Sequence, residues 1–368
     1  MAAVTIRTVR LFTFRLPLTA PLKLRDRTLS HREGCVIRLT SERGLVGWGE
    51  ASPLPGFSRE TLDEVRGQLA ELRSRLQGRT LPPDIEQMAG SFEEWLREYA
   101  LWPSARFGVE AAVLDLLSVE RQTPLHVLLG AARHQAVPVN ALVSGSPEEV
   151  IRAVTEIRQS GYRAVKLKVG HDRMETEIAL VRRICDLVKD SMRVRLDANR
   201  AWSLAEAISF AEGLTGCDIE YLEEPCRTDD ETQMFARRSN LEVALDETLA
   251  GITPEKLGGL QAAAVVLKPT ILGGVEKTMR FAVEAKRLAV KPVVSSSYET
   301  SLGMRVLAHL AAALDDDDTP VGLDTTRWFA RDLLQPPMRV AAGRMMLPQE
   351  PDGAVGPDPQ CLREITDE

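Results

Sequence analysis

Apolar and polar residues alternate along two stretches near the start of the chain. Residues 4–16 place an apolar side chain at nearly every second position, and the same pattern returns at 35–50. Because successive side chains of a strand point to opposite faces, this period of two predicts strands with one buried face. A turn signal at 42–44, Glu-Arg-Gly, divides the second stretch and favours antiparallel pairing.

The two stretches that follow have helical spacing instead. Residues 58–78 repeat apolar side chains every three or four positions, with Ser58 as the candidate N-terminal cap. Residues 104–122 show the same spacing. Antiparallel strands followed by helices are typical of an α+β unit, so we predict an α+β domain over residues 1–130.

A different rhythm begins at residue 137, where short apolar runs rich in Val, Ile and Leu are each followed by a helical segment. Strands that alternate with helices predict parallel β/α units, and eight of them predict a closed barrel over residues 131–335. The remaining residues, 336–368, are rich in Pro, Gly and Asp and are expected to form a C-terminal extension. The eight runs are VPVNALV (137–143), AVKLKV (164–169), RVRLDA (193–198), IEYLEE (219–224), VALDE (243–247), AVVLKP (264–269), PVVSSS (292–297) and VGLDT (321–325).

Composition narrows the classes of function. The 46 Lys and Arg residues are outnumbered by 53 Asp and Glu residues, and the net charge of −7 repels a phosphate backbone, so we expect no nucleic-acid partner. The five cysteines form no CxxC pair, which favours free thiols in a reducing compartment. No apolar stretch is long enough to span a bilayer. We expect a cytoplasmic protein without a membrane partner, and the oligomeric state is left open.

Ionisable residues stand at or near the ends of five successive barrel strands. Their spacing is about one β/α unit, and the carboxyl ends of barrel strands form the active-site face, so all six side chains are expected at one rim. Six ionisable groups that converge there are costly to desolvate and hard to explain by packing. The six, which we call the ladder, are Lys166 and Lys168, then Asp197, Glu223, Asp246 and Lys268.

The three carboxylates of this ladder suit a hard cation. Mg²⁺ prefers oxygen ligands in octahedral geometry and keeps positions for water or substrate. For any one carboxylate the alternative is an unrelated salt bridge, but three carboxylates at the ends of three successive strands favour a metal site. Lys166 and Lys168 lie side by side on one strand, where mutual repulsion can lower a lysine pKa towards that of a general base. Lys268 arrives from the far side of the cavity.

Longer strings around these residues resemble the enolase superfamily, in its muconate lactonizing enzyme subgroup, and most closely the o-succinylbenzoate synthase family. The resemblance covers roughly residues 10–335. It implies an α/β fold, a modified TIM (β/α)7β barrel with an N-terminal α+β capping domain. The strings are SPLPGFSRET (52–61), KVG (168–170), LDANRAW (196–202), LEEPC (222–226), LDET (245–248), LKPTILGG (267–274), SSSYETSLG (295–303) and GLDT (322–325).

The resemblance also implies roles for the ladder. Asp197, Glu223 and Asp246 would hold Mg²⁺, with Glu223 chosen because it stands two residues before the proline. Lys168 would be the base that removes a proton α to a carboxylate and then delivers it to the departing hydroxyl. Lys268 would stay cationic on the opposite face. For Lys166 the resemblance implies a role in setting the pKa of Lys168 and in contacting carboxylate oxygen.

Residues around the ladder take supporting roles in the same resemblance. Arg195 and Asn199 flank Asp197 and would orient it. Ser295, Ser296 and Gly322 would line the substrate pocket, although serines at a strand end can also satisfy backbone groups.

Two further features of this region bear on the pocket. The stretch 25–27 and the loop 52–57 would cap the barrel mouth. Tyr298 is a departure from the family pattern inside the serine string. Glu299, which some relatives use as an acid, is left outside the catalytic set.

The activity implied is an Mg²⁺-dependent syn dehydration of a cyclohexadiene carboxylate, 2-succinyl-6-hydroxy-2,4-cyclohexadiene-1-carboxylate, to 2-succinylbenzoate in menaquinone biosynthesis. The partner is thus a small-molecule carboxylate. The alternative is an N-acylamino acid racemase or dipeptide epimerase, which uses the same metal and both lysines. A barrel without catalysis that serves as a scaffold is the third reading, and the intact ladder argues against it.

Overall fold

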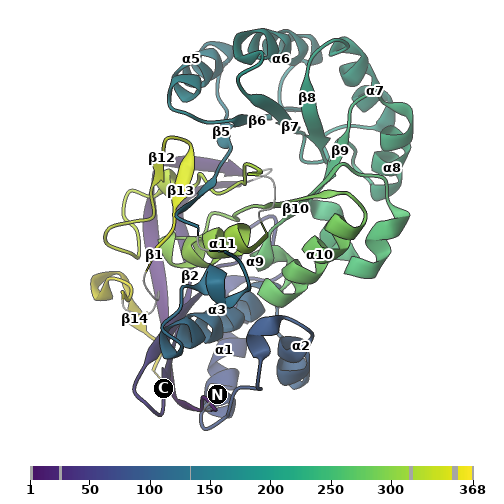
Figure 1. Cartoon of the computed structure of the whole chain (residues 1–368). Helices are drawn as coiled ribbons and strands as arrows, with labels where there is room; N and C mark the ends of the chain where they lie inside the picture. The colour runs from purple at the N-terminus through teal and green to yellow at the C-terminus, as the bar shows by residue number, and fades with distance from the viewer. Residues whose placement is uncertain (1–2, 25–26, 133, 315–317, 350–354, 367–368) are drawn as a thin grey trace.

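A computed structural model describes residues 3–24, 27–132, 134–314, 318–349 and 355–366 (Figure 1). The curved parallel sheet carries helices on its outer side, and an antiparallel sheet with its own helices lies beside it (Figure 1). Of the segments named above, residues 25 and 26 and, in the C-terminal extension, residues 350–354, 367 and 368 lie outside the described part. No described helix has the length and apolar character needed to cross a bilayer.

The antiparallel sheet has the strand order β14-β1-β2-β3. Strands β1 (Ile6–Leu24) and β2 (Arg27–Ser41) pair along almost their whole length, from Ile6 opposite Ser41 to Leu24 opposite Arg27. The alternating pattern therefore predicts the type of these strands correctly. Both strands are longer than the pattern indicates, because the hairpin continues to its tip.

The helices of this region lie near their predicted positions, but the N-terminal cap of the first helix is not the predicted residue. Helix α1 (Leu62–Leu76) is capped by Thr61, whose side chain and that of Glu64 form a reciprocal capping box. Ser58 is not the cap: its hydroxyl accepts the backbone N–H of Leu54 in the preceding turn. Helix α3 (Pro103–Glu120) matches the predicted 104–122 closely. The other elements here are β3 (Val46–Ala51), η1 (Ile85–Gln87), α2 (Ser91–Leu96), η2 (Arg97–Tyr99) and α4 (Leu125–Leu128).

Seven parallel strands form the curved sheet in the order β11-β10-β9-β8-β7-β6-β5. Isolated bridges complete the ring, because Val321 pairs with Val139 and Gly322 pairs with Ser295. The eighth predicted strand is thus reduced to a two-residue closure. The strands are β5 (Ala141–Val143), β6 (Ala164–Lys168), β7 (Arg193–Asp197), β8 (Ile219–Glu223), β9 (Val243–Leu245), β10 (Ala264–Leu267) and β11 (Lys291–Val294).

Two β/α units depart from the regular pattern. The run 137–143 is divided into β4 (Ala136–Pro138), which pairs outside the barrel, and β5. After β9 the chain forms two 3₁₀ helices, η3 (Glu247–Gly251) and η4 (Pro254–Gly259), in place of an α-helix. The remaining helices are α5 (Pro147–Gln159), α6 (Met174–Val188), α7 (Leu204–Gly213), α8 (Asp229–Arg238), α9 (Pro269–Leu272), α10 (Val275–Arg287), α11 (Ser301–Leu314) and η5 (Thr326–Trp328).

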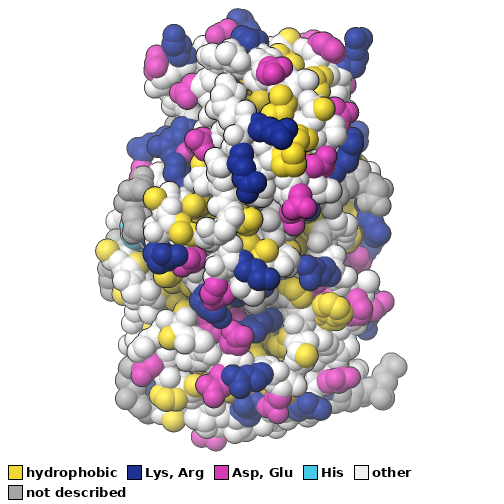
Figure 2. All heavy atoms as spheres, turned by 90° about the vertical axis from the view of Figure 1, so that its right-hand side faces the viewer, with side chains coloured by type: hydrophobic (Ala, Val, Ile, Leu, Met, Phe, Trp, Pro, Cys, Tyr) yellow, Lys and Arg dark blue, Asp and Glu magenta, His cyan; other side chains and the backbone are white. Residues whose placement is uncertain are grey.

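The C-terminal segment returns to both parts of the molecule. Strands β12 (Val340–Ala341) and β13 (Arg344–Met346) extend from β4, and η7 (Pro359–Cys361) leads to β14 (Arg363–Glu364) on the edge of β1. On the face of the molecule shown in Figure 2, basic and acidic side chains intermingle. Arg280 on α10, for example, pairs with Glu93 and Glu255 at 2.8 and 2.7 Å.

Two glycines of β3 let helix α3 lie directly on the strand. A Cβ atom at Gly49 would stand 2.0 Å from the carbonyl oxygen of Gly108, and one at Gly47 would stand 2.3 Å from that of Ala112. The Gly47-Trp48-Gly49 sequence is therefore a packing feature of the strand. Helix α3 also packs on α9 and α10, so this contact joins the two parts of the molecule.

We expect Gly49→Ala to lower the free energy of unfolding by at least about 2 kcal/mol, because the added methyl group meets backbone atoms that have no room to move. Gly67→Ala on α1 is the matched control. Nothing lies within 4 Å of its Cβ position, and alanine favours a helix, so a gain of roughly 0.5–1 kcal/mol is expected. Urea denaturation measures both changes. A neutral Gly49→Ala would contradict the close packing of β3 on α3.

Candidate active site

The strand pairing of the barrel places the ladder residues in neighbouring positions. Lys168 at the end of β6 is the register partner of Asp197 at the end of β7, and Asp197 is in turn the partner of Glu223 at the end of β8. Asp246 follows β9 directly, and Lys268 follows β10. All lie at the carboxyl ends of their strands, where barrel enzymes place their chemistry.

The lysines and carboxylates of the ladder contact one another inside the barrel. Lys166 Nζ lies 3.1 Å from Asp197 Oδ2 and 2.6 Å from Glu223 Oε2, and Lys168 Nζ lies 2.7 Å from the same oxygen of Asp197. On the other side, Lys268 pairs with Asp246. The Glu223 side chain is fully buried, whereas that of Lys168 is 27% exposed. Lys168 is thus the more accessible of the two β6 lysines.

Electrostatic interactions set the charge states of these groups. Burial disfavours the charge of Lys166, but Asp197 and Glu223 outweigh burial and raise its pKa well above the ordinary value. The carboxylates in contact with Lys166 therefore favour its ammonium form, and the lowered lysine pKa expected of the base stays a prediction. Burial and the neighbouring charge of Asp197 raise the pKa of Glu223.

Glu224, the neighbour of Glu223, holds the loop that carries Asp246. Its carboxylate accepts the backbone N–H of Asp246 at 2.9 Å and that of Thr248 at 2.7 Å, and Arg200 donates to it at 3.0 Å. Sequence reasoning missed this role, and the consecutive glutamate pair was its only signal. Glu224 also has a positive φ of 40°, which is uncommon for a residue with a side chain and is found most often at functional sites.

Asn199 and Arg195, the two residues that flank Asp197 in sequence, lie in different places. The backbone N–H of Asn199 donates to Asp197 Oδ1 at 3.1 Å, and its side-chain oxygen accepts from Lys168. Arg195 is fully buried and donates to Glu220 at 2.6 Å and to the Pro320 carbonyl at 2.6 Å. These contacts of Arg195 lie away from Asp197, so Asn199 supports the ladder directly and the orienting role of Arg195 stays a prediction.

The residues predicted to line the pocket mostly contact one another. Ser296 Oγ lies 2.7 Å from Thr325 Oγ1, and the backbone N–H of Ser296 donates to the Gly322 carbonyl at 3.0 Å. Ser295 lies against Gly322, where a Cβ would meet its hydroxyl at 2.5 Å. These contacts close the barrel at the active-site end, and the pocket-lining role of the three residues stays a prediction.

Glu299 is buried in the loop that follows β11. Its carboxylate accepts from Thr270 Oγ1 and from the backbone N–H of Ser297, each at 2.6 Å. These bonds hold the loop in place. Neither partner is a ladder lysine.

Glu50, at the end of β3, joins the capping region to the barrel. It accepts the backbone N–H groups of Thr300 at 3.1 Å and of Gly303 at 2.9 Å, together with the hydroxyls of Ser52 and Thr300. These N–H groups lie at the start of α11, where a negative charge is favoured by the helix dipole. Burial nevertheless raises the pKa of Glu50 to about 7.

The donor set fits a divalent cation. Among the described residues Oε1 of buried Glu223 has no hydrogen-bond partner, and Oε2 is in an ion pair with Lys166. A buried carboxylate oxygen without a partner favours a nearby cation, and a second and third carboxylate stand on the adjacent strands. Among the described residues no three Asp, Glu, His or Cys side chains already lie at metal-binding separations. The lysine ammonium groups contact the carboxylates instead.

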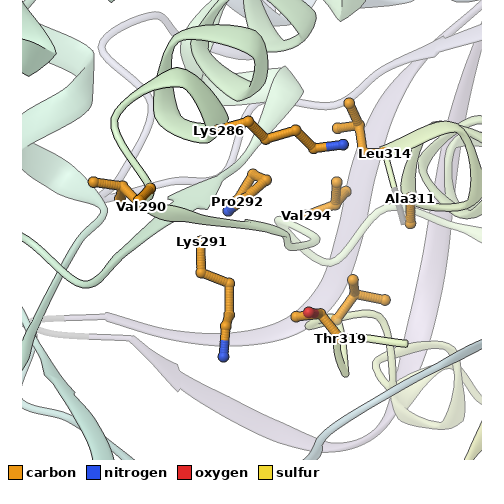
Figure 3. Close-up of a pocket in the computed structure, with 10 residues that line it drawn as sticks. Lys286, Val290, Lys291, Pro292, Val294, Ala311, Leu314 and Thr319 are labelled. Atoms are coloured by element: carbon orange, nitrogen blue, oxygen red, sulfur yellow. The ribbon is translucent and has the colours of Figure 1, made fainter. Parts of the chain in front are cut away.

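A cavity of about 400 Å³ lies at the opposite end of the barrel (Figure 3). It is lined by the start of β11 and the ends of the helices on either side, with Lys286 reaching across towards Leu314 and Val294 forming part of the apolar wall (Figure 3). None of its lining residues belongs to the ladder. The chemistry of the site therefore does not extend to this end.

Family models match both the capping region and the barrel of this chain, and known proteins match most of its length. Residues 6–116 match the model of the MenC N-terminal domain, and residues 149–358 match that of the enolase C-terminal domain-like family. An o-succinylbenzoate synthase of Citrobacter koseri is 34% identical over 87% of this chain and 91% of its own length. One of Aliivibrio fischeri is 35% identical over 89% and 93%. The chain belongs to the o-succinylbenzoate synthase family of the enolase superfamily.

Solved structures confirm the fold of this family. The L-Ala-D/L-Glu epimerase of Bacillus subtilis is 26% identical and superposes with a TM-score of 0.85 over 96% of this chain and 99% of its own. A muconate lactonizing enzyme of Pseudomonas fluorescens is 23% identical, with a TM-score of 0.87 over 98% and 100%. The predicted α/β barrel with a capping domain is thus correct. We propose that the boundary between the two lies near residue 130.

Glu50 generates a prediction on pH. Its pKa rises from 4.5 in the unfolded chain to about 7 in the fold, so the folded state binds the extra proton. The contribution of Glu50 to stability is therefore complete below pH 4.5 and is lost as the pH rises through 7. Relative to Glu50→Gln, the wild type should lose roughly 2–3 kcal/mol of unfolding free energy between pH 4.5 and pH 8.

Urea denaturation at several pH values measures this difference. Glu71→Gln, at an exposed position on α1, is the control and should follow the wild type at every pH. A constant gap between wild type and Glu50→Gln across this range would show that Glu50 does not titrate there.

Proposed function

We propose that this protein is an o-succinylbenzoate synthase, which dehydrates 2-succinyl-6-hydroxy-2,4-cyclohexadiene-1-carboxylate to 2-succinylbenzoate. The names of its relatives and their coverage of the whole chain support this activity. The observation that carries the chemistry is the pair of opposed lysines. Lys168 lies on β6 and Lys268 follows β10, with the strands of the carboxylates between them. This arrangement suits proton removal α to a carboxylate.

Asp197, Glu223 and Asp246 would hold Mg²⁺, which is general in this superfamily. When bound, Mg²⁺ supplies positive charge to the substrate carboxylate and so acidifies the carbon next to it. The unpartnered Oε1 of buried Glu223 supports this assignment. Glu224 would act through Asp246 by holding the backbone N–H of that residue in place.

Lys168 would be the base. It is the more exposed of the β6 lysines, and Asn199 and Asp197 hold its Nζ at the rim. After removing the α proton, the same ammonium group would deliver it to the departing hydroxyl on the same face, which makes the elimination syn. Lys268 would remain cationic and stabilise the negative charge of the enediolate, and its pairing with Asp246 supports that role. Lys166 would contact carboxylate oxygen.

A racemase or epimerase of N-acylamino acids remains the second candidate, because an epimerase of dipeptide type shares the fold at 26% identity. That reaction needs an acid on one face and a base on the other, so Lys268 would have to transfer a proton. The dehydration needs only Lys168. The role of Lys268 therefore separates the two functions.

Replacing Lys168 with Ala should abolish conversion of the cyclohexadiene substrate, with a loss of at least about 10⁴-fold in kcat, because the variant lacks the proposed base. Lys268→Arg should retain measurable dehydration while stopping the racemisation of N-succinylamino acids, which needs a proton-transferring group on each face. Product formation is followed by its absorbance, and racemisation by the change in optical rotation. Turnover by Lys168→Ala would overturn the base assignment.

Removing divalent cations with a chelator should silence the enzyme, and added Mg²⁺ should restore it. Glu223→Gln should weaken Mg²⁺ binding by at least tenfold, because the substitution removes a charged ligand. Calorimetry with Mg²⁺ alone measures the binding. Glu212→Gln, at an exposed position on α7, is the matched control and should bind the cation normally. Full activity without any cation would contradict the proposed mechanism.

A further inference from the structure

Apolar side chains from four separate segments meet at the mouth of the barrel. Leu22 and Leu24 come from the tip of the β1–β2 hairpin, Leu54 and Phe57 from the loop after β3, and Tyr298 and Trp328 from the barrel. We call these six residues the mouth cluster. The Phe57 ring centroid lies 5.7 Å from Lys268 Nζ, so the cluster borders the ladder.

Tyr298 holds a special place in the mouth cluster because of its backbone. It follows the serines at the end of β11 and has a φ of 59°, in the left-handed region that is uncommon for a side chain of this size. Such a conformation costs free energy and persists only when its surroundings impose it.

Arg32 imposes that conformation. Its guanidinium donates to the carbonyl oxygens of Tyr298 at 3.1 Å and Ser297 at 3.3 Å, and also to those of Ser52 and Pro53 at 3.0 Å each. Arg32 is only 2% exposed. One buried arginine of the capping region therefore ties the Tyr298 loop of the barrel to the loop that carries Phe57.

The Tyr298 side chain lies in the mouth cluster beside Trp328. Its ring stands edge-on to Trp328 with centroids 6.2 Å apart and an interplanar angle of 86°. Burial raises the pKa of its phenol, and the charges of Lys268 and Lys166 act on that phenol in the opposite direction. The hydroxyl has no hydrogen-bond partner in the described part of the chain, although it is a group that can both donate and accept.

Resting on the proposed dehydration, we propose that Tyr298 is a specificity-determining residue whose hydroxyl donates a hydrogen bond to an oxygen of the substrate and whose ring packs against the six-membered carbon ring. A partly buried hydroxyl without a protein partner favours a ligand that supplies an acceptor at that point. The aromatic ring favours a flat cyclic ligand over a flexible chain.

Tyr298→Phe and Tyr298→Leu separate the two contributions. The phenylalanine variant keeps the ring, so KM for the cyclohexadiene substrate should rise about tenfold while kcat stays within about threefold. The leucine variant also loses the ring, and kcat/KM should fall by about 100-fold. Affinity for the product 2-succinylbenzoate, measured by calorimetry with Mg²⁺ present, should fall in parallel with KM.

The control is Tyr99→Phe, a tyrosine of the capping region whose hydroxyl contacts Arg79 and which should leave KM unchanged. Tyr298→Phe alters one atom, so it keeps the test valid even if the leucine variant fails to fold. An unchanged KM and product affinity in Tyr298→Phe would overturn the role of the hydroxyl, and unchanged kcat/KM in a folded Tyr298→Leu would overturn that of the ring. A wild type that does not form 2-succinylbenzoate would instead reject the proposed function.

Discussion

The structure depends on the burial of six charges at the carboxyl end of one parallel sheet. Lys166, Asp197 and Glu223 lie deep in the barrel, where an unpaired charge would be far too costly to desolvate. The lysines offset the carboxylates through direct contacts, Lys166 and Lys168 with Asp197 and Lys268 with Asp246. These pairs lower the free-energy cost of burying the charges, so the site stays polar while the protein stays folded. A divalent cation and an anionic substrate add opposite charges to the same site.

The capping region completes the site by holding loops that the barrel strands themselves do not hold. Loops at the carboxyl ends of barrel strands have few contacts with their own sheet. Arg32 supplies four hydrogen bonds to carbonyl oxygens, two on the barrel loop of Tyr298 and two on the loop after β3, and Glu50 accepts the N–H groups at the start of α11. Both residues are buried and come from the antiparallel sheet. The close approach of β3 to α3, which Gly47 and Gly49 permit, sets the distance at which these contacts form.

Much of the fold is readable from local patterns, and the errors have physical causes. Alternation predicts β1 and β2, and strand-end spacing predicts the order of the ladder. The start of α1 is wrong by three residues because Ser58 and Thr61 are both good capping residues, and only Thr61 has a glutamate three positions later. The run 137–143 divides into two strands because its first half pairs with β13, a segment some 200 residues away in sequence. The contacts of Lys166 with Asp197 and Glu223 could not be predicted, because spacing shows which residues share a strand but not which charges touch.

The sequence by itself determined the barrel rhythm, the six ionisable residues and the family, because each is carried by residue types at regular spacing. The tertiary structure decided the contacts between segments that are distant in sequence. Only the folded chain shows that Glu224 accepts a hydrogen bond from the loop of Asp246 and that Arg195 pairs with Glu220 inside the barrel. It also shows that Arg32 donates to the loop of Tyr298. The reason is that a side chain's partner depends on how strands curve and which loops meet above them. No periodic pattern along the chain shows which loops contact one another, so the mouth of the site can be described only from the folded structure.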